Sequence, residues 1–479
     1  MDINPNPRKT GTMPPPHVVV IGGGLAGLAA SIALTDQGIR VCLLEKNPRL
    51  GGRATSYRLP TGEYIDNCQH VTLRCCTNLE DFYRRIGVAD KIHYYEHLLF
   101  SDSKHRRAGI KPSRLPAPFH LAPSFAAFTL LTIKDKFSIA RAMLRILRSG
   151  GSPRLPRGMT MLDWLRRAKQ TPAAIDRFWR VVLVSALNEV LERTDAGYGI
   201  LVFWKAFLSN PAAFGVGIPA VPLAELYASC CERIERNGGE VRTRCAVDDV
   251  CVSNGSAIGV RLEDGNRVTA DYYVVAVPFD RLLKLAPAEI RGTEIFANLA
   301  NLGASPITGV HMWFDRPLMS EPFLTSVDHT IQWVFNKAAP GAAEGAETGQ
   351  YLQIVISASH ELSDRSQQEI IDICGRELCD LLPAAGEAKL MRAVVIRENA
   401  ATFSPAPGCD RWRPSQKTPI RNLFLAGDWT QTGWPATMES AVRSGYQAAE
   451  AILSTEGWHV PLVRPELPPS GVARWFART

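Results

Sequence analysis

The sequence has no uninterrupted apolar run of the roughly 18 residues that a membrane-spanning helix needs. Its 11 cysteines include no CxxC pair, so neither a zinc site nor a dithiol redox centre is predicted. Most of them are expected to be buried free thiols in a reducing cytoplasm. The net charge of +7 is small for 479 residues, and it gives no reason to expect nucleic-acid binding. Residues 1–16 are polar and proline-rich, with no apolar signal segment, which predicts a disordered tail.

The first structured segment is predicted to be a strand, a glycine-rich turn, a helix and a second strand. The apolar run 17–21 precedes Gly22-Gly-Gly-Leu-Ala-Gly27, and the helical pattern of residues 28–37 ends before Gly38. A second apolar run, 39–44, ends in Glu45. In such a unit, N–H groups at the helix start bind a pyrophosphate, and the carboxylate accepts hydrogen bonds from an adenosine ribose. The predicted dinucleotide contacts are Gly22, Gly24, Leu25, Ala26, Gly27, Glu45 and Lys46.

Two long insertions interrupt this nucleotide-binding part of the chain. Residues about 95–215 are helix-rich, and residues 296–395 mix strand patterns, such as 308–314 and 351–357, with a helix at 366–382. A length of 479 residues with 46% apolar content is enough for two structural units. The predicted boundaries are 17–94, 216–295 and 396–458 for the nucleotide-binding domain, and 95–215 and 296–395 for a substrate domain. Residues 459–479 contain a cluster of prolines and are predicted to be a loosely packed or disordered tail.

The residues after Glu45 separate FAD from NAD as the predicted cofactor. Lys46-Asn-Pro-Arg-Leu-Gly-Gly-Arg53, followed much later by Ala426-Gly427-Asp428, resembles the glutathione-reductase-like FAD fold. The expected fold class is α/β, a discontinuous FAD-binding Rossmann domain with an inserted mixed α+β substrate domain. The resemblance implies flavin and phosphate contacts from Gly52, Arg53, Val247, Gly427, Asp428, Trp434, Thr437 and Met438. Plain structural roles are the alternative: a helix cap for Asp428, a surface charge for Arg53 and core packing for Trp434.

Three longer strings are more selective than the dinucleotide motif. Asp66-Asn-Cys-Gln-His-Val, the segment 75–88 and the segment 425–442 together resemble the hydroxysqualene dehydroxylase family, also called squalene-associated FAD-dependent desaturases. The similarity covers roughly residues 17–453. It departs from the family at Cys68, where glycine is usual, so the shape of this loop is open.

The resemblance implies that the protein removes an allylic hydroxyl group from hydroxysqualene and forms squalene, with reduced FAD as the hydride source. Loss of water leaves a delocalised cation, so the chain must supply a proton donor and exclude water. Asp66 and His70 are the candidate donors, and the alternative for both is that they only fix a loop. No second nucleotide motif is found, so the electron donor is unknown.

Residues about 104–150 are predicted to touch a membrane. Basic residues from Lys104 to Arg114 precede an apolar run, and Arg141, Arg145 and Arg148 share one helical face. The opposite face is predicted to carry Phe137, Ala140, Leu144 and Leu147. Because hydroxysqualene partitions into bilayers, we expect a cytoplasmic protein held peripherally on the inner face of a bacterial membrane. An ordinary amphipathic helix that covers the substrate domain is the alternative.

Two other functions remain open at this point. An oxidative isoprenoid desaturase or an amine oxidase would use the same scaffold. The non-enzymatic alternative is a flavin-binding protein that supports a prenyl synthase and catalyses no reaction itself.

Overall fold

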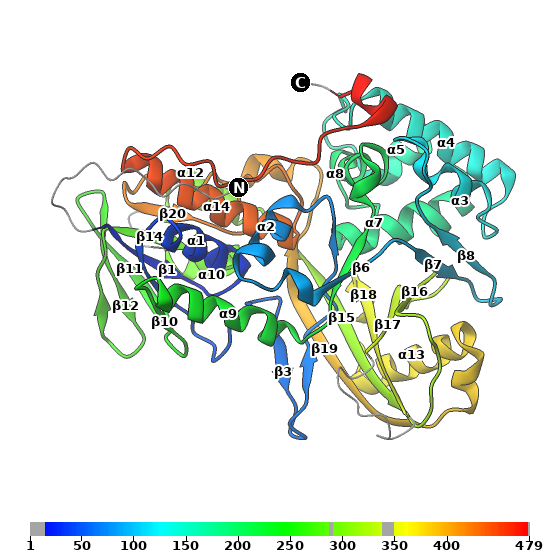
Figure 1. Cartoon of the computed structure of the whole chain (residues 1–479), viewed down its shortest axis with the longest axis horizontal. Coiled ribbons are helices and arrows are strands. Elements are labelled where there is room, and N and C mark those ends of the chain that lie inside the picture. The colour runs from blue at the N-terminus through cyan, green and yellow to red at the C-terminus, as the bar shows by residue number, and fades with distance from the viewer. Residues whose placement is uncertain (1–14, 287–290, 338–348, 478–479) are drawn as a thin grey trace.

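Five parallel strands form the sheet of the nucleotide-binding domain (Figure 1). The computed structural model of the chain describes residues 15–286, 291–337 and 349–477. The strand order is β10-β2-β1-β14-β20, and each neighbouring pair runs parallel. The strands β1, β2 and β14 are almost fully buried, as a parallel sheet covered on both faces requires. The bounds are β1 (His17–Ile21), β2 (Arg40–Leu44), β10 (Glu240–Arg242), β14 (Tyr272–Val275) and β20 (Leu423–Leu425).

Helices α1 (Leu25–Thr35) and α14 (Met438–Thr455) pack closely, although they lie at opposite ends of the sequence. A Cβ atom at Gly445 would lie 2.2 Å from the carbonyl oxygen of Ala26, so only glycine allows this approach. Helices α2 (Thr77–Arg85) and α9 (Leu223–Arg236) pack against α14 and α1, respectively. Two small sheets adjoin this domain, one of β3 (Ser56–Arg58) and β4 (Tyr64–Asp66), the other of β5 (Thr72–Leu73), β9 (Val216–Pro219) and β6 (Ile92–Tyr95).

A three-stranded antiparallel sheet and two short helices complete the described part of this domain. They are β11 (Val247–Ser253), β12 (Ser256–Leu262), β13 (Arg267–Val268), α10 (Phe279–Leu285) and α12 (Glu294–Leu299).

A seven-stranded sheet forms the base of the substrate domain, with strand order β19-β15-β18-β17-β16-β7-β8. Helix α13 (Gln367–Leu381) covers one face, where an apolar cluster includes Val310, Met312 and Leu378. The segment predicted as helix-rich, 95–215, supplies two of these strands. Strand β19 crosses the predicted boundary at 395/396 because it pairs with β15 along almost its whole length. The bounds are β7 (Leu98–Ser101), β8 (Arg107–Ile110), β15 (Ala304–Phe314), β16 (Phe323–Ser326), β17 (Trp333–Asn336), β18 (Gln350–Ser357) and β19 (Leu390–Phe403).

Most helices of the substrate domain lie in its other half, around an aromatic core. Trp179 and Phe203 meet there at 4.5 Å between ring centroids, and both are fully buried. Two π-helical turns, 175–179 and 204–208, extend the helices of this half. The bounds are α3 (Ala122–Ala126), α4 (Ile133–Arg148), α5 (Met161–Arg167), α6 (Pro172–Ala174), α7 (Arg180–Leu187) and α8 (Ala196–Phe203).

The C-terminal tail runs from the nucleotide-binding domain across to the helical half (Figure 1). The Ser470 N–H donates to the Ser209 carbonyl, and the Val472 N–H donates to the Ala117 carbonyl. Residues 459–477, predicted as a loosely packed or disordered tail, are therefore bonded to distant elements at these points. The predicted N-terminal tail, 1–16, lies outside the described residues except for its last two.

Three expectations from composition can be compared with the structure. All 11 cysteines are free thiols and most are buried, as predicted. Within the described ranges no helix is both long and apolar enough to cross a membrane. The same residues contain no group of His, Cys, Asp and Glu side chains that would hold a metal ion.

Candidate functional site

The first turn of α1 lies directly after β1, at the carboxyl edge of the parallel sheet. Gly24 is the N-cap residue, and this turn contains neither a side-chain cap nor an acidic residue. Gly22 has φ of +107°, and a Cβ atom at Gly27 would lie 1.9 Å from the Gly22 carbonyl oxygen. The N–H groups of Leu25 and Ala26 are thus left to bind an anion, and the positive helix end favours one. These residues fit a pyrophosphate.

Glu45 follows β2 at the same edge and is buried. Its Oε2 accepts from the Gly23 N–H at 2.6 Å, and its Oε1 accepts from the backbone and side-chain N–H groups of Asn47 at 2.8 Å each. The Cys245 N–H donates to the Glu45 carbonyl, which brings the start of β11 at Val247 close to this corner. Lys46 is exposed beside it. The predicted ribose-binding residue is therefore held rigidly next to the glycine-rich turn.

The Gly-Gly-Arg turn meets the end of β20. A guanidinium nitrogen of Arg53 pairs with the Asp428 carboxylate, and another donates to the Ala401 carbonyl at 2.8 Å. Gly52 touches the α1 turn, since a Cβ atom there would lie 2.8 Å from the Gly24 Cα atom. Gly427 leaves room for the Trp429 ring, which a Cβ atom would strike at 2.2 Å. The structure thus brings together the motifs that the sequence separates by hundreds of residues.

The N-terminus of α14 lies beside this junction. The Thr437 side chain caps it by accepting from the Ser440 N–H at 3.2 Å, and Met438 is its first residue. Glu439 in the same turn accepts from the Leu79 N–H and the Asn78 amide, and burial raises the pKa of its carboxyl group. Where it is ionised, this carboxylate offsets part of the positive charge at the N-terminus of α14 and weakens its attraction for an anion.

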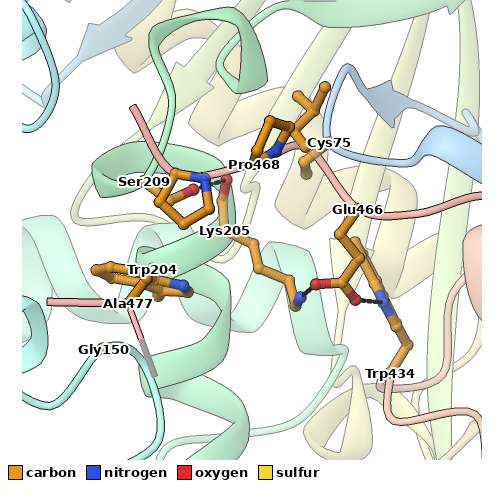
Figure 2. A pocket seen from close by; sticks show the side chains of 11 residues that line it. Cys75, Gly150, Trp204, Lys205, Ser209, Trp434, Glu466, Pro468 and Ala477 are labelled. Carbon is orange, nitrogen blue, oxygen red and sulfur yellow. Dashed lines mark hydrogen bonds and ion pairs between the residues drawn. The ribbon is translucent and has the colours of Figure 1, made fainter. Parts of the chain in front are cut away.

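Trp434 packs against the C-terminal tail. Figure 2 shows its ring across an open cleft of about 230 Å³ from Trp204, with Lys205 and Glu466 between them. The indole N–H donates to Glu466 Oε1 at 2.9 Å, and Glu466 also pairs with Lys205. Burial, and secondly the charge of Arg443, lower the pKa of Lys205 to about 8. These contacts argue against the predicted place of the Trp434 ring at the flavin.

Asp66 is buried and surrounded by donors. Its Oδ1 accepts from the Ser56 hydroxyl at 2.7 Å and from the Leu223 N–H, at the start of α9, at 3.0 Å. Its Oδ2 lies 3.3 Å from the Lys337 Nζ. All three of these groups are hydrogen-bond donors, so the Asp66 side chain is an acceptor in each of these contacts.

His70 ends the same loop. Its Nδ1 lies 3.0 Å from the Cys68 carbonyl oxygen, which can only accept, so Nδ1 carries a proton and Nε2 is the nitrogen that titrates. Burial lowers the pKa of this imidazole. The loop is anchored to the cofactor side, because the Asn67 amide donates to the Arg53 carbonyl at 2.6 Å and the Asn67 N–H donates to Thr55.

Four further polar residues join this loop and were missed from the sequence. Lys337 donates to the Gln69 side chain at 2.9 Å, and the Gln353 amide lies 3.5 Å from the Asp66 carbonyl. His311 and Tyr351 are the other two, and they bond to each other at 2.6 Å. A polar residue within an apolar strand pattern, His311 in 308–314 and Gln353 in 351–357, is the signal that could have indicated two of them.

Comparisons with known proteins show similarity to flavin-dependent and isoprenoid-modifying proteins. Residues 25–453 match the family model described as flavin containing amine oxidoreductase. The chain is 27% identical to a 15-cis-phytoene desaturase of an Oncidium hybrid cultivar, over 92% of this chain and 78% of the relative. It is 26% identical to a probable zeta-carotene desaturase of Synechococcus elongatus, over 92% and 99%.

Solved structures show the fold. An oxidoreductase from Methanosarcina mazei has a TM-score of 0.71 at 17% identity, with 91% of this chain and all of that chain covered. A putrescine oxidase bound to putrescine has a TM-score of 0.68 at 15% identity, with 92% and 99% covered. The solved structures confirm the predicted α/β fold class, and the family match confirms the predicted FAD cofactor.

Proposed function

We propose that this chain, which belongs to the flavin containing amine oxidoreductase family, removes the hydroxyl group of hydroxysqualene reductively and releases squalene. Membership of that family makes it an FAD-dependent oxidoreductase, and we therefore set aside the alternative of a flavin-binding partner without turnover. Relatives named for phytoene and zeta-carotene support a long, apolar isoprenoid as the substrate class.

One observation carries the proposal. The string Asp66–His70, part of the resemblance to hydroxysqualene dehydroxylases, lies between the two domains. Asn67 bonds to the cofactor side at Arg53, and its carbonyl oxygen would lie 3.0 Å from a Cβ atom at Gly309 of the substrate sheet. These two contacts support a proton donor on this loop, between the cofactor side and the substrate sheet.

His70 is the proposed donor. In the reaction the carbon–oxygen bond breaks, the oxygen leaves as water with a proton from His70 Nε2, and a new carbon–hydrogen bond forms. FAD, when bound and reduced, supplies the hydride. The Cys68 carbonyl fixes the imidazole so that Nε2 is the free end. The reaction also requires that water be kept from the site, because water would trap the allylic cation.

An oxidative isoprenoid desaturase is the second candidate, because relatives named as phytoene and zeta-carotene desaturases match most of the chain. Anaerobic mixing of the reduced protein with hydroxysqualene, followed by product identification, separates the two. Squalene together with oxidised FAD supports the proposed function. Turnover only by the oxidised protein, with a more unsaturated product from squalene or phytoene, supports the desaturase.

We also propose that α4 contacts a membrane. Ile133 and Phe137, one helical turn apart, are 73% and 74% exposed, and Leu144 follows on the same face. The predicted apolar face of this helix is wrong in one position, because Leu147 is buried. The side chains of Arg141 and Arg145 donate to carbonyl groups at the C-terminal end of α5. The apolar side chains face outward because the buried face is formed by Ile139, Ala142 and Ile146.

Liposome cosedimentation of an Ile133→Ser/Phe137→Ser variant tests this contact. We expect weaker binding to anionic vesicles than for the unchanged protein. Ile258→Ser is the matched control, because Ile258 is an exposed apolar residue on β12, in the other domain. Equal binding by all three proteins would remove α4 from consideration.

A further inference from the structure

The face of the seven-stranded sheet opposite α13 carries buried polar residues. On β15, Val310, Met312 and Phe314 pack toward α13, so the alternating residues Gly309 and His311 point the other way. The Asp66–His70 loop lies on this second face, because the Asn67 carbonyl oxygen is the nearest atom to a Cβ placed at Gly309. His311 is therefore one strand repeat, about 7 Å, from the point where the loop touches the sheet.

His311 and Gln353 lie directly opposite each other on β15 and β18. Both are fully buried, and each has one side-chain atom, Nε2 of His311 and Oε1 of Gln353, without a hydrogen-bond partner among the described residues. Directly opposed side chains have Cβ atoms about 5 Å apart, so one small group can reach both. A buried polar atom without a hydrogen-bond partner destabilises the folded protein. Two such atoms side by side therefore indicate a shared polar ligand.

The contact between Tyr351 and His311 determines whether His311 Nε2 carries a proton and can donate a hydrogen bond. The Tyr351 hydroxyl lies 2.6 Å from His311 Nδ1, which is its only acceptor among the described residues. Burial raises the pKa of this phenol, so it keeps its proton, and burial lowers the pKa of His311 to about 4, so the imidazole is neutral. Tyr351 then donates to Nδ1, and the imidazole proton lies on Nε2. The pair thus offers one donor, His311 Nε2, and one acceptor, Gln353 Oε1.

A hydroxyl group accepts one hydrogen bond and donates another, which is the complement of this pair. Backbone and charged groups tie the pair to the Asp66–His70 loop. The Gln353 amide lies 3.5 Å from the Asp66 carbonyl, and the Lys337 Nζ joins Asp66 to Gln69. A ligand held by the pair would therefore lie near the loop that carries the proposed proton donor.

We propose that His311 and Gln353 form a subsite that binds the hydroxyl group of the allylic alcohol substrate and so distinguishes it from the hydrocarbon product. This proposal rests on the proposed function. The hydrocarbon has no group to bond the two atoms, so it binds more weakly and is released.

Binding measurements on the oxidised, FAD-loaded protein test the subsite. Hydroxysqualene and squalene are titrated separately in micelles of fixed composition, and binding is followed by tryptophan fluorescence, since Trp313 stacks on Tyr351 at 4.5 Å. We expect His311→Leu to weaken hydroxysqualene binding roughly tenfold, the value of about one hydrogen bond, and to leave squalene binding unchanged. His311→Gln keeps an N–H near the Nε2 position and should retain the preference. Gln353→Met provides a second test that does not depend on the folding of the His311 variants.

Three other outcomes of these binding measurements would contradict the subsite. Equal losses for both ligands would mean a general packing defect, and no loss for either would mean that the pair holds only water. A changed flavin spectrum or FAD content in ligand-free His311→Leu would mean that the pair serves the cofactor. The proposed function is judged separately by squalene formation in the reduced, unchanged protein. Preferential alcohol binding without squalene would refute the function and leave the subsite standing.

Discussion

Arg53 and Asp428, 375 residues apart, form an ion pair between the Gly-Gly-Arg turn and the end of β20. Each was predicted to approach the cofactor, and the structure shows that they also hold each other. The Asp428 side chain is almost completely buried, whereas that of Arg53 is one-third exposed. Loss of Arg53 thus leaves a buried, unpaired carboxylate at the cofactor site, whereas loss of Asp428 leaves the partly exposed Arg53 without its partner.

We expect Asp428→Ala to lower FAD affinity at least tenfold, because the unpaired Arg53 and the altered turn no longer match the cofactor. Titration of FAD into apoprotein measures this. Arg58→Ala, an exposed arginine on the neighbouring hairpin, serves as the control and should bind FAD normally. Unchanged affinity in Asp428→Ala would separate this pair from cofactor binding.

Two glycines of the first turn should respond differently to the same substitution. A Cβ atom at Gly24 would meet nothing closer than 3.7 Å, whereas one at Gly27 would lie 1.9 Å from the Gly22 carbonyl oxygen. We expect Gly24→Val to fold but to bind little FAD, since its side chain occupies the path of the pyrophosphate. Gly27→Ala should itself lose stability. Thermal melting and flavin absorbance distinguish them, and a fully yellow Gly24→Val protein would contradict the cofactor placement.

Buried His311 should make stability depend on pH. Its pKa is about 4 in the folded chain and near 6.5 when unfolded, so the unfolded chain binds the extra proton. Above about pH 6.5 the imidazole is neutral in both states and does not reduce the stability of the protein. As the pH falls toward 4, the free energy of unfolding decreases by about 3 kcal/mol. Chemical unfolding at several pH values should show a steeper loss for the unchanged protein than for His311→Gln. The same pH dependence in both proteins would contradict the lowered pKa of His311.

Activity should rise in mild acid if His70 donates the proton. Its pKa is lowered by burial, so the imidazolium form becomes populated only as the pH falls below about 6.5. We expect kcat/KM for dehydroxylation to rise over that range, and His70→Gln to lose both the rise and most of the rate. Asp66→Asn should instead lower stability, because Asp66 binds the start of α9. A His70→Gln protein with the original pH profile would exclude His70.

The local part of this site could be predicted and the long-range part could not. Gly22 to Gly27 and Glu45 are close in sequence, and strand, turn and helix patterns fix their geometry. His311 and Gln353 meet only through the register of two strands, which no motif reports. Similarly, Glu466 bonds to Trp434 and Lys205 across the domain boundary, so the proline-rich tail looked unstructured in sequence. Asp66 looked catalytic because its contact with Leu223, 157 residues away, is invisible in the sequence.

The most direct test of the central claim follows the hydride. The enzyme is reduced so that deuterium lies on flavin N5, and one turnover with hydroxysqualene is run without exchange. We expect squalene with one deuterium at the former carbinol carbon or its allylic partner, accompanied by oxidised FAD. Unlabelled squalene would contradict hydride delivery from the flavin. No squalene at all would contradict the reductive function and favour the oxidative desaturase.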